Sequence, residues 1–271
     1  MWAFPRSVAI PALVALTIAT SATALGDSKD PAGSYDLAGQ TVASTPYEGR
    51  VEIEPSGRSF LVDWRQGGPA NSRGFALRLG DVLGVAADDR EDDFGIVLYR
   101  VDHGHLEGIW NGYPNARGPI GRETLDGPAS LDGSFKISRG VRPDNGEYGG
   151  HVEIKRAGQT YLVDWYAPSY HYIGTGVMMG NVFVVGYAYK HRPTVAAYCL
   201  ESEAYVGVTA SGEDQALGAE ILWPHGKPAP EGLPARLTAM RQNGAALACG
   251  TPVVDHPRGG PAILQSAQAS P

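Results

Sequence analysis

Short runs of β-branched and aromatic residues alternate with clusters of Gly, Asn, Asp and Pro, about every 8–12 residues along the chain. This alternation predicts many short antiparallel strands joined by tight turns. No segment of residues 33–223 keeps the apolar period of an amphipathic helix. In the first half of the chain the pattern predicts strands over residues 33–38, 47–54, 59–65, 73–79, 82–87, 94–101, 105–110 and 119–124.

The pattern repeats itself once. Val51-Glu52-Ile53 recurs as Val152-Glu153-Ile154, and Leu61-Val62-Asp63-Trp64 recurs as Leu162-Val163-Asp164-Trp165, both at an offset of 101. Further matches follow at offsets of 97 to 101: Gly33 with Gly133, Tyr47 with Tyr148, Gly80 with Gly180, Val82 with Val182, Tyr99 with Tyr198, Gly121 with Gly218, Glu123 with Glu220 and Leu125 with Leu222. A spacing that changes by only a few residues along the chain indicates tandem copies of one unit.

Alternation within strand 59–65 assigns its two faces. Phe60, Val62 and Trp64 share one face, which we expect to point into the core, and Asp63 lies on the other. The same reading applies to the second copy, where the inward residues are Tyr161, Val163 and Trp165 and the outward residue is Asp164.

The predicted fold class is therefore all-β, with two tandem antiparallel meander units. About eight strands with local connections favour a small up-and-down β-barrel for each unit, because closure removes open edges. A pair of two-sheet β-sandwiches is the alternative. The units are expected over residues 25–130 and 131–223.

The two ends of the chain differ from the repeats. Residues 1–24 read as a signal peptide, with Arg6, an apolar stretch over 8–19 and a small-residue cleavage pattern ending at Ala24. We therefore expect an exported protein, periplasmic or secreted; an uncleaved anchor is the alternative. Residues 224–271 form a Pro/Gly/Ala-rich segment that is expected to be partly disordered, with either a hairpin or a short helix over 235–249.

Charge narrows the range of partners. The net charge is −7, and residues 25–130 hold 17 acidic and 10 basic residues. Binding to phosphate backbones depends on Lys and Arg, so nucleic acid is not an expected partner. No later segment approaches eighteen continuous apolar residues, so membrane insertion of the mature chain is not expected either.

The two cysteines are Cys199 and Cys249. In an exported chain a low, even count predicts one disulfide bond. Two buried free thiols are the alternative.

Several motifs resemble those of a bacterial secreted repeat family that is often labelled fibronectin-binding-protein-like. They are Gly133-Ser134-Phe135, residues 145–150, residues 161–165, Gly174-Thr175-Gly176 and, in the first copy, residues 106–110. The resemblance covers about residues 33–223 and implies a fold similar to calycin-like β-barrels. The first copy departs from it at residues 73–76 and the second at 205–209. It implies no catalytic residue.

One stretch of the second copy is rich in aromatic side chains and histidines, and we predict that it binds a ligand. Exposed tyrosines with polar neighbours are typical of recognition surfaces, here in a predicted loop over 166–173. Barrel filling is the alternative. The predicted ligand-binding residues are Trp165, Tyr166, Tyr170, His171, Tyr172, Tyr189 and His191.

Other candidate chemistry is sparse. His103 and His105 share a strand face and are weak metal candidates without a third ligand, so a hairpin turn is favoured. Residues 88–93 form an acidic run, interpreted as a solvated hairpin tip. There is no nucleophile elbow, phosphate loop or dinucleotide fingerprint, so no catalytic residue and no cofactor is predicted.

These observations favour a non-catalytic exported binding module that recognises a protein, glycan or small ligand in the cell envelope or outside the cell. One alternative is an envelope-directed hydrolase with Asp63, Asp164, His171 or His191 as acid–base groups. Another is an inhibitor or structural partner of an envelope enzyme.

Overall fold

The computed structural model describes residues 30–65, 71–88, 93–113, 115–168, 170–244 and 249. The predicted signal peptide, and the part of the C-terminal segment expected to be disordered, lie outside these ranges.

All eight strands predicted in the first half of the chain are present, and the second half repeats them. The strands are β1 Gly33–Gln40, β2 Pro46–Ser56, β3 Ser59–Arg65, β4 Asn71–Leu79, β5 Val82–Ala87, β6 Phe94–Asp102, β7 His105–Gly112, β8 Gly121–Asp126, β9 Gly133–Val141, β10 Glu147–Tyr148, β11 His151–Ala157, β12 Thr160–Ala167, β13 Tyr170–Met179, β14 Val182–Ala188, β15 Thr194–Glu201, β16 Ala204–Ala210 and β17 Gly218–Pro224. One helix, α1, spans Leu233–Asn243.

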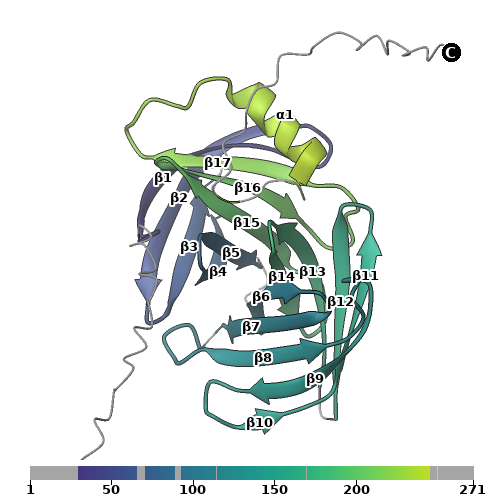
Figure 1. The fold of residues 1–271 in the computed structure, drawn as a ribbon. Helices are drawn as coiled ribbons and strands as arrows, with labels where there is room; N and C mark the ends of the chain where they lie inside the picture. The colour runs from purple at the N-terminus through teal and green to yellow at the C-terminus, as the bar shows by residue number, and fades with distance from the viewer. Residues whose placement is uncertain are drawn as a thin grey trace, which may run out of the picture.

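The strands form two closed antiparallel barrels (Figure 1). The first barrel has the order β1-β17-β16-β15-β5-β4-β3-β2 and closes through pairing of β1 with β2. The second has the order β9-β11-β12-β13-β14-β6-β7-β8 and closes through β8 and β9, with the short β10 added beside β9. The prediction of an all-β chain with two small barrels is confirmed.

Each barrel is built from both sequence copies. The first barrel combines β1–β5 of the first copy with β15–β17 of the second, and the second barrel combines β6–β8 with β9–β14. In Figure 1 the purple-to-blue and green strands accordingly share one barrel. The boundary near residue 130 therefore separates the two sequence copies but not the two barrels. Each copy gives three strands to the barrel that is built mainly from the other copy.

The chain crosses between the barrels twice, after β5 and after β14. The first crossing contains the acidic run over 88–93. Its interpretation as a hairpin tip is wrong, because β5 pairs with β4 and β15 whereas β6 pairs with β7 and β14. The strands on either side of this run belong to different barrels.

Apolar side chains form three clusters. One lies inside each barrel, and the third, which includes Leu77, Leu98 and Val184, lies between the barrels and under α1. A Cβ atom added to Gly84 of β5 would lie 2.6 Å from Val184 Cγ1 and 2.8 Å from Leu98 Cδ1. There is thus no room for a side chain at Gly84, where the two barrels meet.

The predicted faces of β3 and β12 are confirmed. Val62 and Trp64 are buried in the first barrel, and their counterparts Val163 and Trp165 in the second. Asp63 faces outward and pairs with Arg73 of β4 (Nε to Oδ1, 3.6 Å). In the same way, Asp164 pairs with the Arg192 guanidinium at 2.8 Å.

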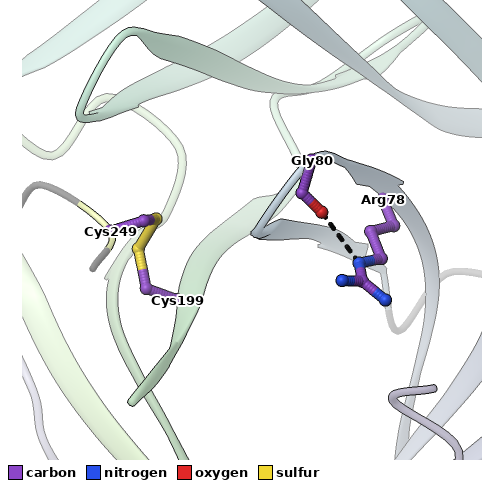
Figure 2. The surroundings of a disulfide bond; sticks show 4 residues. All are labelled: Arg78, Gly80, Cys199 and Cys249. Carbon is purple, nitrogen blue, oxygen red and sulfur yellow. Dashed lines mark hydrogen bonds between the residues drawn. A yellow bond between two sulfur atoms is a disulfide. The ribbon is translucent and has the colours of Figure 1, made fainter. Parts of the chain in front are cut away.

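Of the two alternatives for the C-terminal segment, a hairpin or a short helix, the structure has the helix, α1. Pro234 stands in its first turn, where the missing N–H costs no hydrogen bond. Leu237 and Met240 are buried against the first barrel. Cys199 of β15 forms the predicted disulfide with Cys249, close to the β4–β5 turn (Figure 2). No helix in the described residues is long and apolar enough to cross a membrane.

Strand exchange predicts that both barrels unfold together, because neither sequence copy holds all the strands of one barrel. Val51 and Val152 are equivalent, fully buried residues of different barrels. We expect Val51→Ala and Val152→Ala each to lower the free energy of unfolding by about 2–3 kcal/mol and to shift one common transition in urea. Two separable transitions, each moved by only one substitution, would contradict the coupling.

Candidate functional site

A buried carboxyl group with three hydrogen-bond donors lies inside the second barrel. Glu123 of β8 is only 4% exposed. The hydroxyl groups of Tyr99 and Tyr148 donate to its two oxygens, the latter at 2.9 Å, and Trp165 Nε1 donates at 3.2 Å. Three donors for one buried carboxyl offset part of the cost of removing it from water.

This network requires both copies of the repeat. Tyr99 and Glu123 stand on β6 and β8, which precede the copy boundary, and Tyr148 and Trp165 stand on β10 and β12, which follow it. Strand exchange is what brings the four side chains into one barrel.

The first barrel contains the matching group. Glu220 of β17 is buried and accepts hydrogen bonds from Tyr47, at 2.6 Å, and from Tyr198. These residues are the repeat equivalents of Glu123, Tyr148 and Tyr99. The buried acid and its two tyrosines therefore belong to the repeated unit.

Burial dominates the electrostatics of both carboxyl groups. It raises the pKa of Glu123 and of Glu220, and the tyrosine and tryptophan donors only partly oppose this effect. The pKa of Tyr99 and that of Tyr198 are also raised, by burial first and by the adjacent glutamate second. These hydroxyl groups therefore remain protonated, and remain donors, at neutral pH.

A cavity of about 600 Å³ lies beside Glu123 in the second barrel. Its charged lining residues are Asp93, Glu123, Arg142 and Asp144. Burial raises the pKa of Tyr170 in its wall to about 12. The remaining wall is mainly aromatic, formed by Tyr99, Trp110, Tyr113, Tyr148, Trp165, Tyr170, Tyr172 and Tyr187.

Three of these rings have no counterpart in the first barrel, as the strand pairings show. Trp165 pairs with Tyr172 whereas Trp64 pairs with Ser72, and Gly174 pairs with Tyr187 whereas Gly74 pairs with Ala87. Likewise Gly121 pairs with Trp110 whereas Gly218 pairs with Thr209. The aromatic walls are thus a feature of the second barrel, although the buried acid is common to both.

The predicted ligand-binding residues are divided among three places. Trp165, Tyr170 and Tyr172 line the cavity. Tyr172, Tyr189 and His191 line an adjoining hollow of about 360 Å³. The imidazole of His191 also hydrogen-bonds through Nε2 to Asp88, which joins the two segments that cross between the barrels.

The remaining two predicted residues, Tyr166 and His171, do not line the cavity. They stack on one another with ring centroids 4.6 Å apart, as a cross-strand pair of β12 and β13. The predicted loop over 166–173 is therefore wrong, because both strands extend into it. Aromatic residues favour extended backbone, and their stacking stabilises the end of this hairpin.

The histidine pair lies at the β6–β7 turn, as the hairpin interpretation predicted. His103 and Gly104 adopt positive φ there. His105 Nδ1 lies 2.6 Å from Asp126 and His103 Nδ1 lies 2.7 Å from Asp102, so each imidazole has its own carboxylate. Within the described ranges no three His, Cys, Asp or Glu side chains gather as a metal site requires.

The acid–base groups suggested for a hydrolase are likewise dispersed. Asp63 and Asp164 are paired with different arginines, and His171 is stacked outside. None of these three, nor His191, lines the cavity beside Glu123.

Sequence reasoning missed Glu123 and the tyrosines that bind it. A signal was present, because Glu123 recurs as Glu220 within strands whose neighbouring alternate positions are apolar. Glutamate is seldom buried, so a glutamate kept at one inward position of both copies indicates an internal network.

Comparison with protein-family models, with curated proteins and with solved structures found no match for the chain. The resemblance to secreted repeat proteins therefore stays a prediction.

The raised pKa of Glu123 has a measurable consequence. The folded protein holds this proton more tightly than the unfolded chain does, so stability should fall as pH rises through the interval between the two pKa values. Glu123→Gln removes this effect. Urea unfolding between about pH 4 and about pH 8 gives the free energy of unfolding of both proteins. The value for the native protein minus that for the variant should fall as the pH rises.

Asp144→Asn is a control of opposite sign. The backbone N–H of Gly146 and the guanidinium of Arg142 lower the pKa of Asp144, so the corresponding difference should rise with pH up to about pH 5 and change little above it. A pH-independent difference for Glu123→Gln would contradict the account of the buried carboxyl.

Proposed function

We propose that the protein is an exported, non-catalytic binding module that holds a small ligand in the cavity of the second barrel. One observation carries the proposal: eight aromatic side chains surround about 600 Å³ of space next to a buried carboxyl group. Small-molecule sites have volumes of roughly 300–1,000 Å³ and combine apolar walls with few polar groups.

The comparison between the barrels supports ligand binding over simple packing. Both barrels carry the acid–tyrosine network, so this network alone is explained by folding. Three rings of the second barrel are different, namely Tyr172, Tyr187 and Trp110. At the equivalent positions the first barrel has Ser72, Ala87 and Thr209. Large aromatic rings that border open space instead of filling it are typical of a recognition site.

The composition of the wall supports binding without catalysis. Its described residues include no Ser, Thr, Cys, Lys or His, so the acid–base groups of the wall are mainly the carboxyls of Asp93, Glu123 and Asp144. Glu123 already accepts three hydrogen bonds from the protein itself.

Export is supported by the disulfide between Cys199 and Cys249, which needs an oxidising compartment.

Exchange of the wall residues tests the proposal. N-phenyl-1-naphthylamine is uncharged and becomes fluorescent in apolar cavities, and we expect the native protein to bind it. The triple variant Trp110→Thr, Tyr172→Ser, Tyr187→Ala, which gives the second barrel the residues of the first, should bind at least tenfold more weakly because it lacks the stacking surfaces.

Tyr166→Ala is the matched control, since this tyrosine is exposed on the outside of the same barrel and its substitution should leave affinity unchanged. Native protein that does not bind the probe, or a triple variant that binds it equally well, would overturn the proposed function.

A further inference from the structure

We propose that the ligand held in the second barrel is an organic cation, a protonated or quaternary ammonium group joined to an apolar body. This inference rests on the proposed function and adds the chemical class of the ligand. Three features of the cavity lead to it: the arrangement of its rings, the direction of its hydrogen bonds and the charge of its wall.

The rings form a cage with walls at steep angles to one another. Tyr172 and Tyr187 have centroids 5.4 Å apart and planes at 72°, and Tyr187 and Trp165 have centroids 5.7 Å apart and planes at 56°. Trp110 and Tyr148 form a further pair at 79°. Ring faces that surround a space from several directions attract a positive charge through their quadrupoles, which is how aromatic cages bind ammonium groups.

The polar atoms around the cavity are mainly acceptors. Tyr99 and Tyr148 donate their hydroxyl protons to Glu123, Tyr172 donates to Asp93 and Tyr187 donates to the carbonyl oxygen of Asn111, the last two at 3.4 Å. A tyrosine hydroxyl has only one proton, so its oxygen can then only accept.

The tryptophan donors are engaged or covered. Trp165 Nε1 donates to Glu123. Trp110 Nε1 is buried, has no partner among the described residues and lies against the backbone of Gly121, where an added Cβ atom would come within 2.5 Å of it. Acceptor oxygens attract a positive group, so an ammonium group fits this wall whether or not it carries N–H donors, and a sugar, which needs donors and acceptors together, fits it less well.

The charge of the wall favours a cation in the same way. Asp93, Glu123 and Asp144 face one basic residue, Arg142, whose guanidinium is 3.2 Å from Asp144. A positive group beside Glu123 would stabilise the ionised form of this carboxyl, whose pKa burial raises. An anionic ligand would meet repulsion at the same place.

Choline and 3,3-dimethylbutan-1-ol, its uncharged isostere, test the charge alone, because carbon replaces nitrogen in an otherwise matched shape. With N-phenyl-1-naphthylamine as the displaced probe at pH 7, we expect choline to bind at least tenfold more tightly than the isostere. Glu123→Gln should reduce this preference at least fivefold, whereas Glu220→Gln in the first barrel should leave it unchanged.

The native protein decides the question even if a variant fails to fold. Equal or tighter binding of the uncharged isostere, or displacement of the probe by neither compound, would overturn the cation inference and leave the proposed function standing. Failure of N-phenyl-1-naphthylamine itself to bind would instead overturn the proposed function.

Discussion

Barrel closure with strands from both halves of the chain is the constraint on which the rest of this structure depends. The first barrel cannot close without β15–β17, nor the second without β6–β8. The chain must therefore cross twice between the barrels, and apolar side chains such as Leu98 and Val184 pack where they meet. Stability of either barrel is consequently tied to the other, and a site inside one barrel is assembled from residues of both copies.

The buried glutamate is a feature that both barrels share, whereas the aromatic cavity beside it is found in the second barrel. Glu123 and Glu220 lie at equivalent places with equivalent tyrosine donors, and burial raises the pKa of both. Such a group is costly to remove from water, and its hydrogen bonds fix the surrounding side chains. In the first barrel, small residues such as Ala87 stand where the second barrel has aromatic rings. In the second, rings such as Tyr187 stand beside the glutamate around a cavity, and there we place ligand recognition.

Local patterns in the sequence predicted the strands well, because alternation and turn chemistry act over a few residues; Val62 and Trp64 were assigned to the correct face. Strand exchange was beyond such reasoning. The copies are similar, so the local sequence allows β5 to pair either with β6 of the first copy or with β15, which is the second-copy equivalent of β6. Only the packing between the barrels distinguishes the two pairings. The cavity was missed in part for a related reason: Glu123 reads locally as a surface residue, and its burial follows from closure.

The most direct test of the central claim uses the indole N–H resonances of Trp64, Trp110, Trp165 and Trp223 in an ¹⁵N-labelled sample. Two of these tryptophans line the cavity of the second barrel, and the other two lie in the first. On titration with N-phenyl-1-naphthylamine, the resonances of Trp110 and Trp165 should shift with one saturating curve, and those of Trp64 and Trp223 should stay in place. Saturable shifts confined to Trp64 or Trp223, or the absence of shifts at Trp110 and Trp165, would contradict the account.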